Sequence, residues 1–365
     1  MKQLIQISLT LFLLISIKNL SAQNLTETAD DLIKNDSIPE IAFAVVTKDS
    51  ILISKVIGYH KIDEKNGKST ACDNDYFHLG SNTKAITGFI AACLVEQNKI
   101  NWDTKFFDLF PESRSKTNPA YFDITLEDLL THQAKLQSFT GSSDFKNTPN
   151  FEGVKQQKRT KFVEYVLTLP VISDEKTYNY SNAGYSVASV MLEKVSGKSW
   201  EDLVLDVLKN KLHIDYAIGW PNRNFENQPW GHWIEDGKLV PVSPETDYNL
   251  NLLEPGGDLS MQLKDYIKFI QLNIKGLSGE DNIIKSETYR YIHNTRNTYA
   301  IGWENRTSDV NQISTHAGSD GSFLSYVQID RNQLIGYIVI MNCGSKNAED
   351  GIVKIIKQMK SKYGK

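Results

Sequence analysis

A serine and a lysine lie three residues apart at the start of an apolar segment. Ser81 and Lys84 occur in the stretch YFHLGSNTKAITGFIAACLVEQNKI, residues 76–100. Residues three apart are neighbours on a helix, so the hydroxyl and the amine should lie side by side if a helix begins there. A hydroxyl beside an amine that accepts its proton is an activatable nucleophile. The pair therefore predicts covalent catalysis through Ser81.

The spacing alone is weak, because the chain contains it four times: Ser81/Lys84, Ser113/Lys116, Ser143/Lys146 and Ser173/Lys176. Only the first pair is followed by an apolar stripe at helical spacing, formed by Ile86, Phe89, Ile90, Cys93 and Leu94. Burial at such a helix start would lower the pKa of Lys84, and the free backbone N–H groups would suit an oxyanion. The alternative is an N-cap serine beside a solvated lysine.

Two further motifs bring polar groups next to predicted elements. Tyr180-Ser181-Asn182 precedes a segment of helical period, and His316-Ala317-Gly318 lies between a β-like run and a hairpin. A glycine such as Gly318 lets a substrate backbone approach a strand closely. The structural alternatives are a core tyrosine with a satisfied hydroxyl and a polar strand histidine.

The two ends of the chain favour β-structure. Runs 41–47 and 51–59 read as one hairpin, and the stretch FLSYVQIDRNQLIGYIVIMN, residues 323–342, reads as another that turns at residues 330–332. The following stretch, AEDGIVKIIKQM, has helical spacing. We therefore expect both ends to contribute strands to one antiparallel sheet.

The middle of the chain has helical periodicity in five short stretches: LEDLLTH, FVEYVLTL, VASVMLEKV, WEDLVLDVLKN and SMQLKDYIKFIQLNI. The Gly-, Pro- and Asn-rich stretches 135–151 and 219–251 are expected to be surface loops that bind ligands or cover a site. The predicted fold is of the α/β class (α+β type), an antiparallel sheet flanked by helices with an inserted, mainly helical domain. The sheet part is expected at about 38–75 and 296–365, and the helical part at about 76–295.

Composition excludes several functional classes. The 365 residues carry a formal charge of −4 without a long run of one sign, so we expect no nucleic-acid partner and a small-molecule or peptide substrate. The three cysteines match no zinc motif, and the seven histidines form no H-E-x-x-H or other close ligand set. We therefore expect no metal and no cofactor. The sequence does not specify an oligomeric state.

The N-terminus has the layout of a secretory signal. Lys2 is followed by an apolar run over residues 4–17 and by the small residues Ser21 and Ala22 before Gln23. The run is shorter than the roughly 20 residues that span a membrane. The expectation is a signal peptide over residues 1–22, a mature catalytic domain over 23–365 without a membrane span, and a periplasmic or secreted location.

The three motifs, in this order and setting, resemble those of the serine β-lactamase and penicillin-binding protein superfamily, specifically its class C-like branch with Tyr-x-Asn in the middle. The resemblance extends from about residue 38 to residue 359 and includes the phrases FHLGSNTKAITG, ITLEDLLTHQAKL, YNYSNAGYSVASVMLE, EPGGDLSMQLKDYIKF and YAIGWE. It implies a β-lactamase/transpeptidase-like fold with the active site between the sheet and the helical insert.

The resemblance implies three catalytic residues. Ser81 would be the acylated nucleophile and Lys84 its proton partner, while Tyr180 would relay a proton to the leaving group or activate water. It also implies four substrate-binding residues. Asn182 would hold the substrate amide, and His316 and Gly318 would line the cleft. The N–H groups of Ser81 and Ser319 would form the oxyanion hole.

Two departures from the family pattern concern the substrate. His316 replaces the lysine that many relatives have, so a fixed positive charge becomes one that is expected to titrate near neutral pH. Lys135, in the phrase THQAKL, replaces a small residue and is expected to add bulk and charge near the cleft.

The function expected from the sequence is metal-independent hydrolysis by an exported serine hydrolase through an acyl-enzyme on Ser81. Candidate substrates are β-lactams, D-amino-acid peptides and small esters, because one fold supports all three chemistries. The alternative is a catalytically silent cell-wall or peptide binding module on the same fold.

Overall fold

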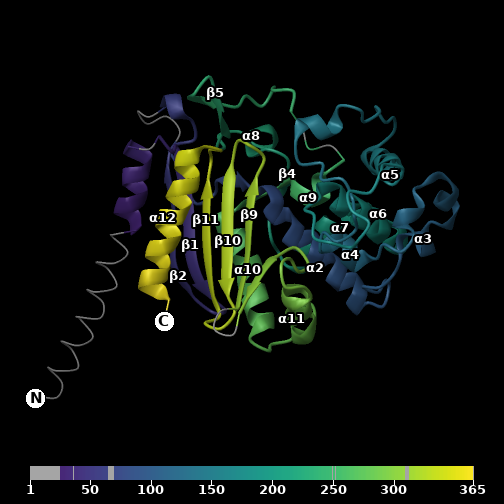
Figure 1. Cartoon of the computed structure of the whole chain (residues 1–365). Helices are drawn as coiled ribbons and strands as arrows, with labels where there is room; N and C mark the ends of the chain where they lie inside the picture. Colours follow the sequence, from purple (N-terminus) through teal and green to yellow (C-terminus); the bar gives the residue numbers. More distant parts are fainter. Residues whose placement is uncertain are drawn as a thin grey trace, which may run out of the picture.

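A six-stranded antiparallel sheet, built from both ends of the chain, forms one side of the computed structural model (Figure 1). The structure describes residues 25–364 except 36, 65–69, 249, 251 and 309–311, so the expected signal peptide lies outside the described residues. The strand order is β2-β1-β11-β10-β9-β8. The strands span β1 Glu40–Thr47, β2 Ile51–Gly58, β8 Glu304–Thr307, β9 Gln312–Ser319, β10 Leu324–Asp330 and β11 Ile335–Met341.

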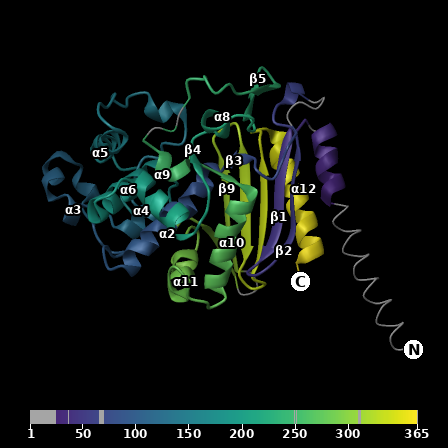
Figure 2. The same cartoon turned by 180° about the vertical axis from the view of Figure 1, so that it is seen from behind.

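The two predicted hairpins meet in the middle of this sheet. β1 pairs with β11, with Ile41 opposite Met341 and Thr47 opposite Ile335. β1 and β11 are apolar at successive positions because helices cover both faces of the sheet (Figures 1 and 2). Ala42 and Ala44 face the larger core with helix α10 (Leu263–Leu277), whereas Phe43 and Val45 pack against α12 (Lys346–Tyr363) and the helix formed by residues 25–35.

The remaining strands form two small antiparallel sheets. β3 (Tyr76–His78), β7 (Leu259–Gln262) and β4 (Ala217–Ile218) lie in the order β3-β7-β4, and β5 (His232–Glu235) pairs with β6 (Lys238–Pro241). β5 and β6 fall within the stretch 219–251, which therefore contains a hairpin in addition to loop. β3 leads directly into the segment that contains Ser81.

The helices gather mainly beside the sheet, as predicted for the middle of the chain (Figure 1). They span α2 Thr83–Glu96, α3 Phe106–Leu109, α4 Leu126–Leu130, α5 Lys155–Val166, α6 Asn182–Ser196, α7 Trp200–Val204, α8 Pro221–Asn224, α9 Glu254–Gly257, α10 Leu263–Leu277, α11 Ser286–Asn294 and α12 Lys346–Tyr363. Single turns of 3₁₀-helix span η1 Ile62–Glu64, η2 Gly80–Asn82, η3 Pro111–Lys116, η4 Pro119–Tyr121 and η5 Ser142–Phe145, and a π-helical segment, η6, spans Leu205–Lys211. No helix in the described part of the chain has the length and apolar character needed to cross a membrane.

The expected boundary of the helical part needs one correction. Helix α10 falls within residues 76–295, but it packs against β1 and β11 and covers one face of the main sheet (Figure 2). Its apolar side chains, including Ile267, Ile270 and Ile274, are buried there. The chain therefore returns to the sheet before residue 296.

A buried ion cluster joins four helices of the helical part. The guanidinium of Arg159 on α5 is fully buried and donates to Glu193 of α6 at 2.6 Å and to Glu201 of α7 at 2.5 Å. Glu254, which begins α9, lies 3.6 Å from the same group. Because α9 packs against α2, which carries Lys84, this cluster fixes the helices that surround Lys84.

Replacement of Arg159 by Met should destabilise the protein by about 3–5 kcal/mol, because the buried carboxylates of Glu193 and Glu254 and the partly exposed carboxylate of Glu201 would lose their counter-ion. The matched control is Lys161→Met, since Lys161 is an exposed cation on the same helix and its loss should cost less than about 0.5 kcal/mol. Urea unfolding followed by circular dichroism measures both values. Equal effects of the two changes would contradict a special role for the buried cluster.

Candidate active site

Ser81 lies in the turn that joins β3 to α2. Turn η2 continues directly into α2, so Ser81 precedes the helix instead of occupying its first turn. Gly80 has a φ of +51°, and a Cβ there would lie 2.4 Å from the backbone N of Ser319. Only glycine fits this turn, because other residues resist that φ and would collide with the neighbouring strand. The turn holds Ser81 at the edge of a cavity.

The amine of Lys84 is enclosed by three oxygen atoms. Its Nζ lies 3.1 Å from Ser81 Oγ, 2.6 Å from Asn182 Oδ1 and 2.6 Å from the carbonyl oxygen of Gly256. The side chain is fully buried, and this burial lowers the pKa of Lys84 well below its usual value. A neutral amine has two N–H groups, which match the two shorter contacts, and one lone pair, which is left for the Ser81 hydroxyl. The geometry fits Lys84 as acceptor of the Ser81 proton.

Tyr180 lies on the other side of the Ser81 hydroxyl. Its ring centroid is 4.7 Å from Lys84 Nζ, and its hydroxyl forms a hydrogen bond with Ser81. Burial raises the pKa of Tyr180 above its usual value, although the hydrogen bond to Ser81 opposes this shift. The group is therefore a protonated phenol at neutral pH. It is suited to donate a proton to a leaving group, whereas Lys84 is suited to act first as base.

Asn182 begins α6 and connects two parts of the site. Its Oδ1 accepts from Lys84, and its Nδ2 donates to the carbonyl of Phe139 at 2.9 Å. Ser181 caps the helix by accepting from the N–H of Gly184 at 3.1 Å. The structure thus places Asn182 beside the nucleophile and the lysine, and its predicted contact with a substrate amide stays a prediction.

The end of strand β9 lies against the turn that contains Ser81. A Cβ at Gly318 would lie 2.1 Å from the carbonyl oxygen of Leu79 and 2.8 Å from the N of Ser81. The glycine therefore permits the backbone contact that brings Ser319 beside Gly80. This arrangement places the N–H groups of Ser81 and Ser319 on neighbouring backbones, as the predicted oxyanion hole requires.

His316 reaches the site, but its expected ionisation is wrong. Its Nε2 lies 2.7 Å from the Tyr299 hydroxyl and its Nδ1 lies 2.7 Å from the carbonyl oxygen of Ala317. Burial, together with the nearby Lys84, lowers the pKa of His316 to about 3. The imidazole is therefore neutral at neutral pH, because the ring is excluded from water and lies close to the amine of Lys84.

The sequence interpretation did not assign roles to several residues around Tyr180. His132 packs its ring 4.3 Å from that of Tyr180 and accepts from the N–H of Ser181 at 3.1 Å. The ring of Tyr299 is tilted against that of His132 and meets that of Tyr180 edge-on. His132 lies in the phrase ITLEDLLTHQAKL and Tyr299 in YAIGWE, so the signal for both residues is the family resemblance of these phrases. The expectation for Lys135 in the first phrase is wrong, because its amine turns to the carbonyl of Asp174 and does not line the described cleft.

A cavity of about 280 Å³ opens at Ser81. It adjoins a second cavity of about 470 Å³ that shares Thr140, Asn182, Tyr248, Leu250 and Leu253 with the first. Residues from both stretches expected to be binding loops, 135–151 and 219–251, line these cavities. The two loops thus lie where a substrate would enter.

One cluster in the described part of the chain has the donor set of a metal site. Ligand atoms of Glu40, His60 and Asp75 lie within 4.8 Å of one another, and all three side chains are buried. None of them lines the cavity at Ser81. Burial and the facing Asp75 carboxylate raise the pKa of Glu40 well above its usual value, so a retained proton also explains the pair of carboxyl groups.

Comparisons with known proteins identify the family and the fold of this chain. A model of the beta-lactamase family matches residues 25–356. A solved class C beta-lactamase superposes with a TM-score of 0.72 at 18% identity over 93% of this chain and 96% of that one. The octameric penicillin-binding protein homologue from Pyrococcus abyssi superposes with a TM-score of 0.69 at 18% identity, over 89% of this chain and 74% of that one.

Curated relatives come from Staphylococcus aureus. Protein flp of strain N315 is 20% identical over 343 residues, which cover 90% of this chain and 65% of that protein. Teichoic acid D-alanine hydrolase is 26% identical over 233 residues, which cover 62% of this chain and 52% of that protein. The chain thus spans somewhat less than two thirds of the length of these relatives.

The solved structures confirm the predicted fold, and the family model extends over most of the chain, including all three motifs. The resemblance inferred from the sequence is therefore confirmed at the level of the family. The chain belongs to the beta-lactamase family of serine hydrolases.

Proposed function

We propose that this protein hydrolyses esters through an acyl-enzyme on Ser81, and that its acyl groups are neutral or carry an amine. The observation that supports the chemistry most directly is the buried amine of Lys84, 3.1 Å from Ser81 Oγ with both remaining contacts made to oxygen acceptors. Such an amine is a base held against a nucleophile, as covalent catalysis needs.

In the proposed first step, Ser81 Oγ forms a bond to the ester carbonyl carbon while its proton passes to Lys84. The negative charge on the carbonyl oxygen faces the N–H groups of Ser81 and Ser319. The bond to the leaving alkoxide then breaks, and the alkoxide takes a proton from Tyr180, which Lys84 re-protonates. In the second step water attacks the acyl carbon, its proton returns through the same groups, and the bond to Oγ breaks.

The charge of the cleft supports the proposed acyl groups. Among the described residues that line the two cavities there is no arginine or lysine, and the neutral His316 supplies no charge in its place. The N–H groups of Lys84 already donate to Asn182 and Gly256, so they are not available to a substrate carboxylate. A carboxylate in the substrate would thus lose its hydration without gaining a fixed cation, which disfavours it. Asp247, at the rim of the second cavity, adds a negative charge.

A relative supports the amine-bearing class. Teichoic acid D-alanine hydrolase is named for the removal of D-alanine, and an aminoacyl ester carries an ammonium group close to its carbonyl. An ammonium group at this position would meet a cleft with acidic and apolar lining and no competing surface cation. β-Lactams and D-amino-acid peptides, which usually carry a carboxylate, fit this lining less well.

We also propose export. The support is the N-terminal pattern of Lys2, an apolar run and small residues before Gln23, which is typical of a cleaved signal. A substrate such as a cell-envelope ester would then be met outside the cytoplasm.

Ser81 should be labelled by a fluorophosphonate, whereas Ser81→Ala should not be labelled. The matched control is Ser173→Ala, because Ser173 has the same Ser-x-x-Lys spacing but its lysine, Lys176, bonds Asp128 instead. Mass spectrometry of the labelled peptide identifies the site. A properly folded wild-type protein without any label would support the silent binding module, and label on another serine would refute the assignment of Ser81.

Neutral p-nitrophenyl butyrate should be cleaved at least about 10-fold more efficiently than anionic p-nitrophenyl hemisuccinate, which has a similar length and the same leaving group. Asp247→Lys should raise kcat/KM for the anionic ester about 3- to 10-fold, because it removes a negative charge from the rim and adds a positive one. Glu245→Lys makes the same charge change on the same loop outside the cavities and is the control. Equal rates for the two esters would overturn the proposed charge preference.

The mature protein recovered from its native host should begin near Gln23 and be found outside the cytoplasm. N-terminal sequencing of the fractionated protein measures both properties. The comparison protein is an Ala22→Arg variant, which should block cleavage because signal cleavage sites need small residues. An intact Met1 terminus in the cytoplasmic fraction would show that the protein is not exported.

A further inference from the structure

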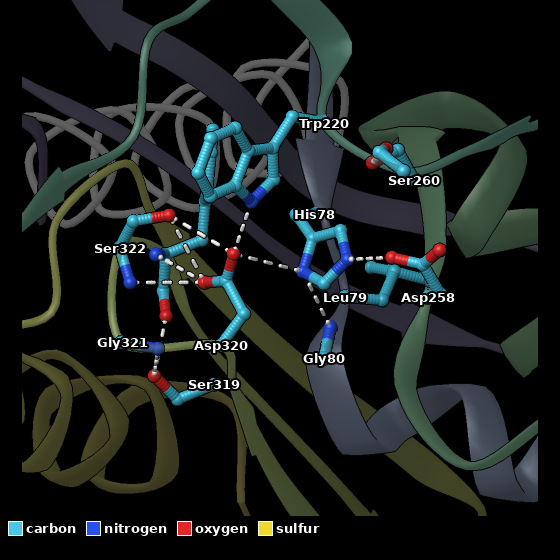
Figure 3. A network of polar contacts seen from close by, with 12 residues as sticks. His78, Leu79, Gly80, Trp220, Asp258, Ser260, Ser319, Asp320, Gly321 and Ser322 are labelled. Atoms are coloured by element: carbon cyan, nitrogen blue, oxygen red, sulfur yellow. Dashed lines mark hydrogen bonds and ion pairs between the residues drawn. The ribbon is translucent and has the colours of Figure 1, made fainter. Parts of the chain in front are cut away.

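One buried imidazole connects the three backbone segments that carry the site (Figure 3). His78, the last residue of β3, has its ring between Asp258 and Asp320. Asp320 directly follows Ser319 of the oxyanion pair. Asp258 follows α9, which supplies the carbonyl of Gly256 to Lys84. His78 itself precedes the Ser81 turn by two residues, so each flank of the site is one or two residues from this network.

The two nitrogens of His78 have different partners. Its Nε2 lies 3.2 Å from Asp258 Oδ1. Its Nδ1 accepts from the backbone N–H of Gly80 at 3.3 Å and lies 3.7 Å from Asp320 Oδ2. A neutral ring with its hydrogen on Nε2 satisfies Asp258 and Gly80 together. A protonated ring has no free lone pair on Nδ1, so it must release the Gly80 N–H and turn toward Asp320.

Asp320 is held firmly enough to serve as the alternative partner. Its carboxylate is fully buried and accepts from the N–H groups of Ser322 and Phe323, each at 2.9 Å, from the Ser322 hydroxyl and from the indole N–H of Trp220 (Figure 3). These donors keep it ionised: although burial opposes the shift, the charge of His78 and these donors lower the pKa of Asp320 below its usual value.

We propose that His78 is a positioning residue whose neutral Nδ1 holds the Gly80 N–H and so fixes the backbone of Ser81, and that proton uptake by His78 transfers this contact to Asp320 and slows acylation. This inference rests on the proposed function of Ser81. It adds a pH-dependent contact outside the active site, because His78 touches neither Ser81 Oγ nor the cavity.

The titratable groups that face the ring are Asp258, from the end of α9, and Asp320, from the turn between β9 and β10. Tyr248, from the 219–251 loop, bonds the carbonyl of Asp320. Burial alone would lower the pKa of His78, but the two carboxylates outweigh it, so the pKa is raised above the usual 6.5. The ring therefore takes up its proton at a higher pH than an unperturbed imidazole does.

Activity and stability should respond to this proton in opposite directions. Because the folded-state pKa of His78 is raised, its contribution to stability is complete below about pH 6.5 and is lost as pH rises through the folded pKa. The neutral form, which dominates above that pKa, is the one that holds Gly80. Acylation should therefore speed up over the same pH range in which this part of the stability disappears.

The experiment compares two near-isosteres of histidine. In His78→Asn the amide oxygen takes the place of Nδ1 and can still accept from Gly80, whereas His78→Gln places its amide nearer the position of Nε2 and Asp258. We expect kcat for p-nitrophenyl butyrate to fall about 10- to 100-fold in His78→Gln with little change in KM. His78→Asn should retain most of kcat and lose one rising limb of the pH profile. His293→Asn, which removes another fully buried histidine outside the site, should keep the wild-type pH profile.

Two measurements separate the possible failures. Fluorophosphonate labelling of Ser81 in the wild-type protein tests the proposed function, and if it fails the inference falls with it. If labelling succeeds but Asn and Gln at position 78 behave alike, the Gly80 contact is not the cause. The imidazole of His78, followed by NMR in the full chain, should titrate above 6.5, and this signal does not depend on catalysis. Titration below 6.5, or an unchanged pH profile in His78→Asn, would overturn the inference.

Discussion

The arrangement of this molecule depends on the exclusion of water from one amine, that of Lys84. Lys84 is fully buried, and a buried amine is costly unless its hydrogens find acceptors. Its partners come from three places that are far apart in the chain: Asn182 Oδ1 at the start of α6 and the carbonyl of Gly256 in α9 accept its N–H groups, and the Ser81 hydroxyl faces its lone pair. The helical part can satisfy Lys84 only if α2, α6 and α9 meet at this point. The convergence of these helices also buries the amine, and this burial lowers the pKa of Lys84, as its proposed role as a base requires.

A second constraint is the contact between two backbones. Gly80 and Gly318 face each other across the boundary between the Ser81 turn and the main sheet, and a Cβ on either residue would collide with backbone atoms. Side chains normally keep a strand and a loop further apart than this. The two glycines therefore set the distance between the N–H groups of Ser81 and Ser319. Strand β9 can keep its position because β10 and β11 anchor it within a sheet that is covered on both faces.

The parts of this structure that follow from local sequence were predictable. The hairpins formed by β1 with β2 and by β10 with β11, and helix α12, follow from apolar spacing within a few residues. Ser81, Lys84, Tyr180 and Asn182 were identifiable because their motifs lie at element boundaries and match a family pattern. The structure brings these four residues together as that pattern implies, although their catalytic roles are still proposals.

Properties that depend on distant residues could not be read from the sequence. The neutral state of His316 depends on burial beside Tyr299 and on Lys84, neither of which its own neighbours in the chain reveal. The position of Lys135 was misjudged for a similar reason, because its partner, the Asp174 carbonyl, lies in another loop. Helix α10 has an ordinary amphipathic pattern, which shows that one face is buried but not whether a sheet or a helix covers it.

The family of this protein is easier to identify than its substrate, because the two depend on different parts of the structure. The groups proposed to react lie in turn η2, at the starts of α2 and α6 and at the end of β9, and the core and the Arg159 ion cluster fix the positions of these elements. The groups that would meet the rest of the substrate, such as Thr140 and Asp247, lie on the loops 135–151 and 219–251. Loop side chains are not constrained by core packing, so their charge can change without disturbing the chemistry. A cleft whose described lining holds no lysine or arginine is therefore compatible with the proposed nucleophile, base and oxyanion site, and we propose that these two loops select the substrate.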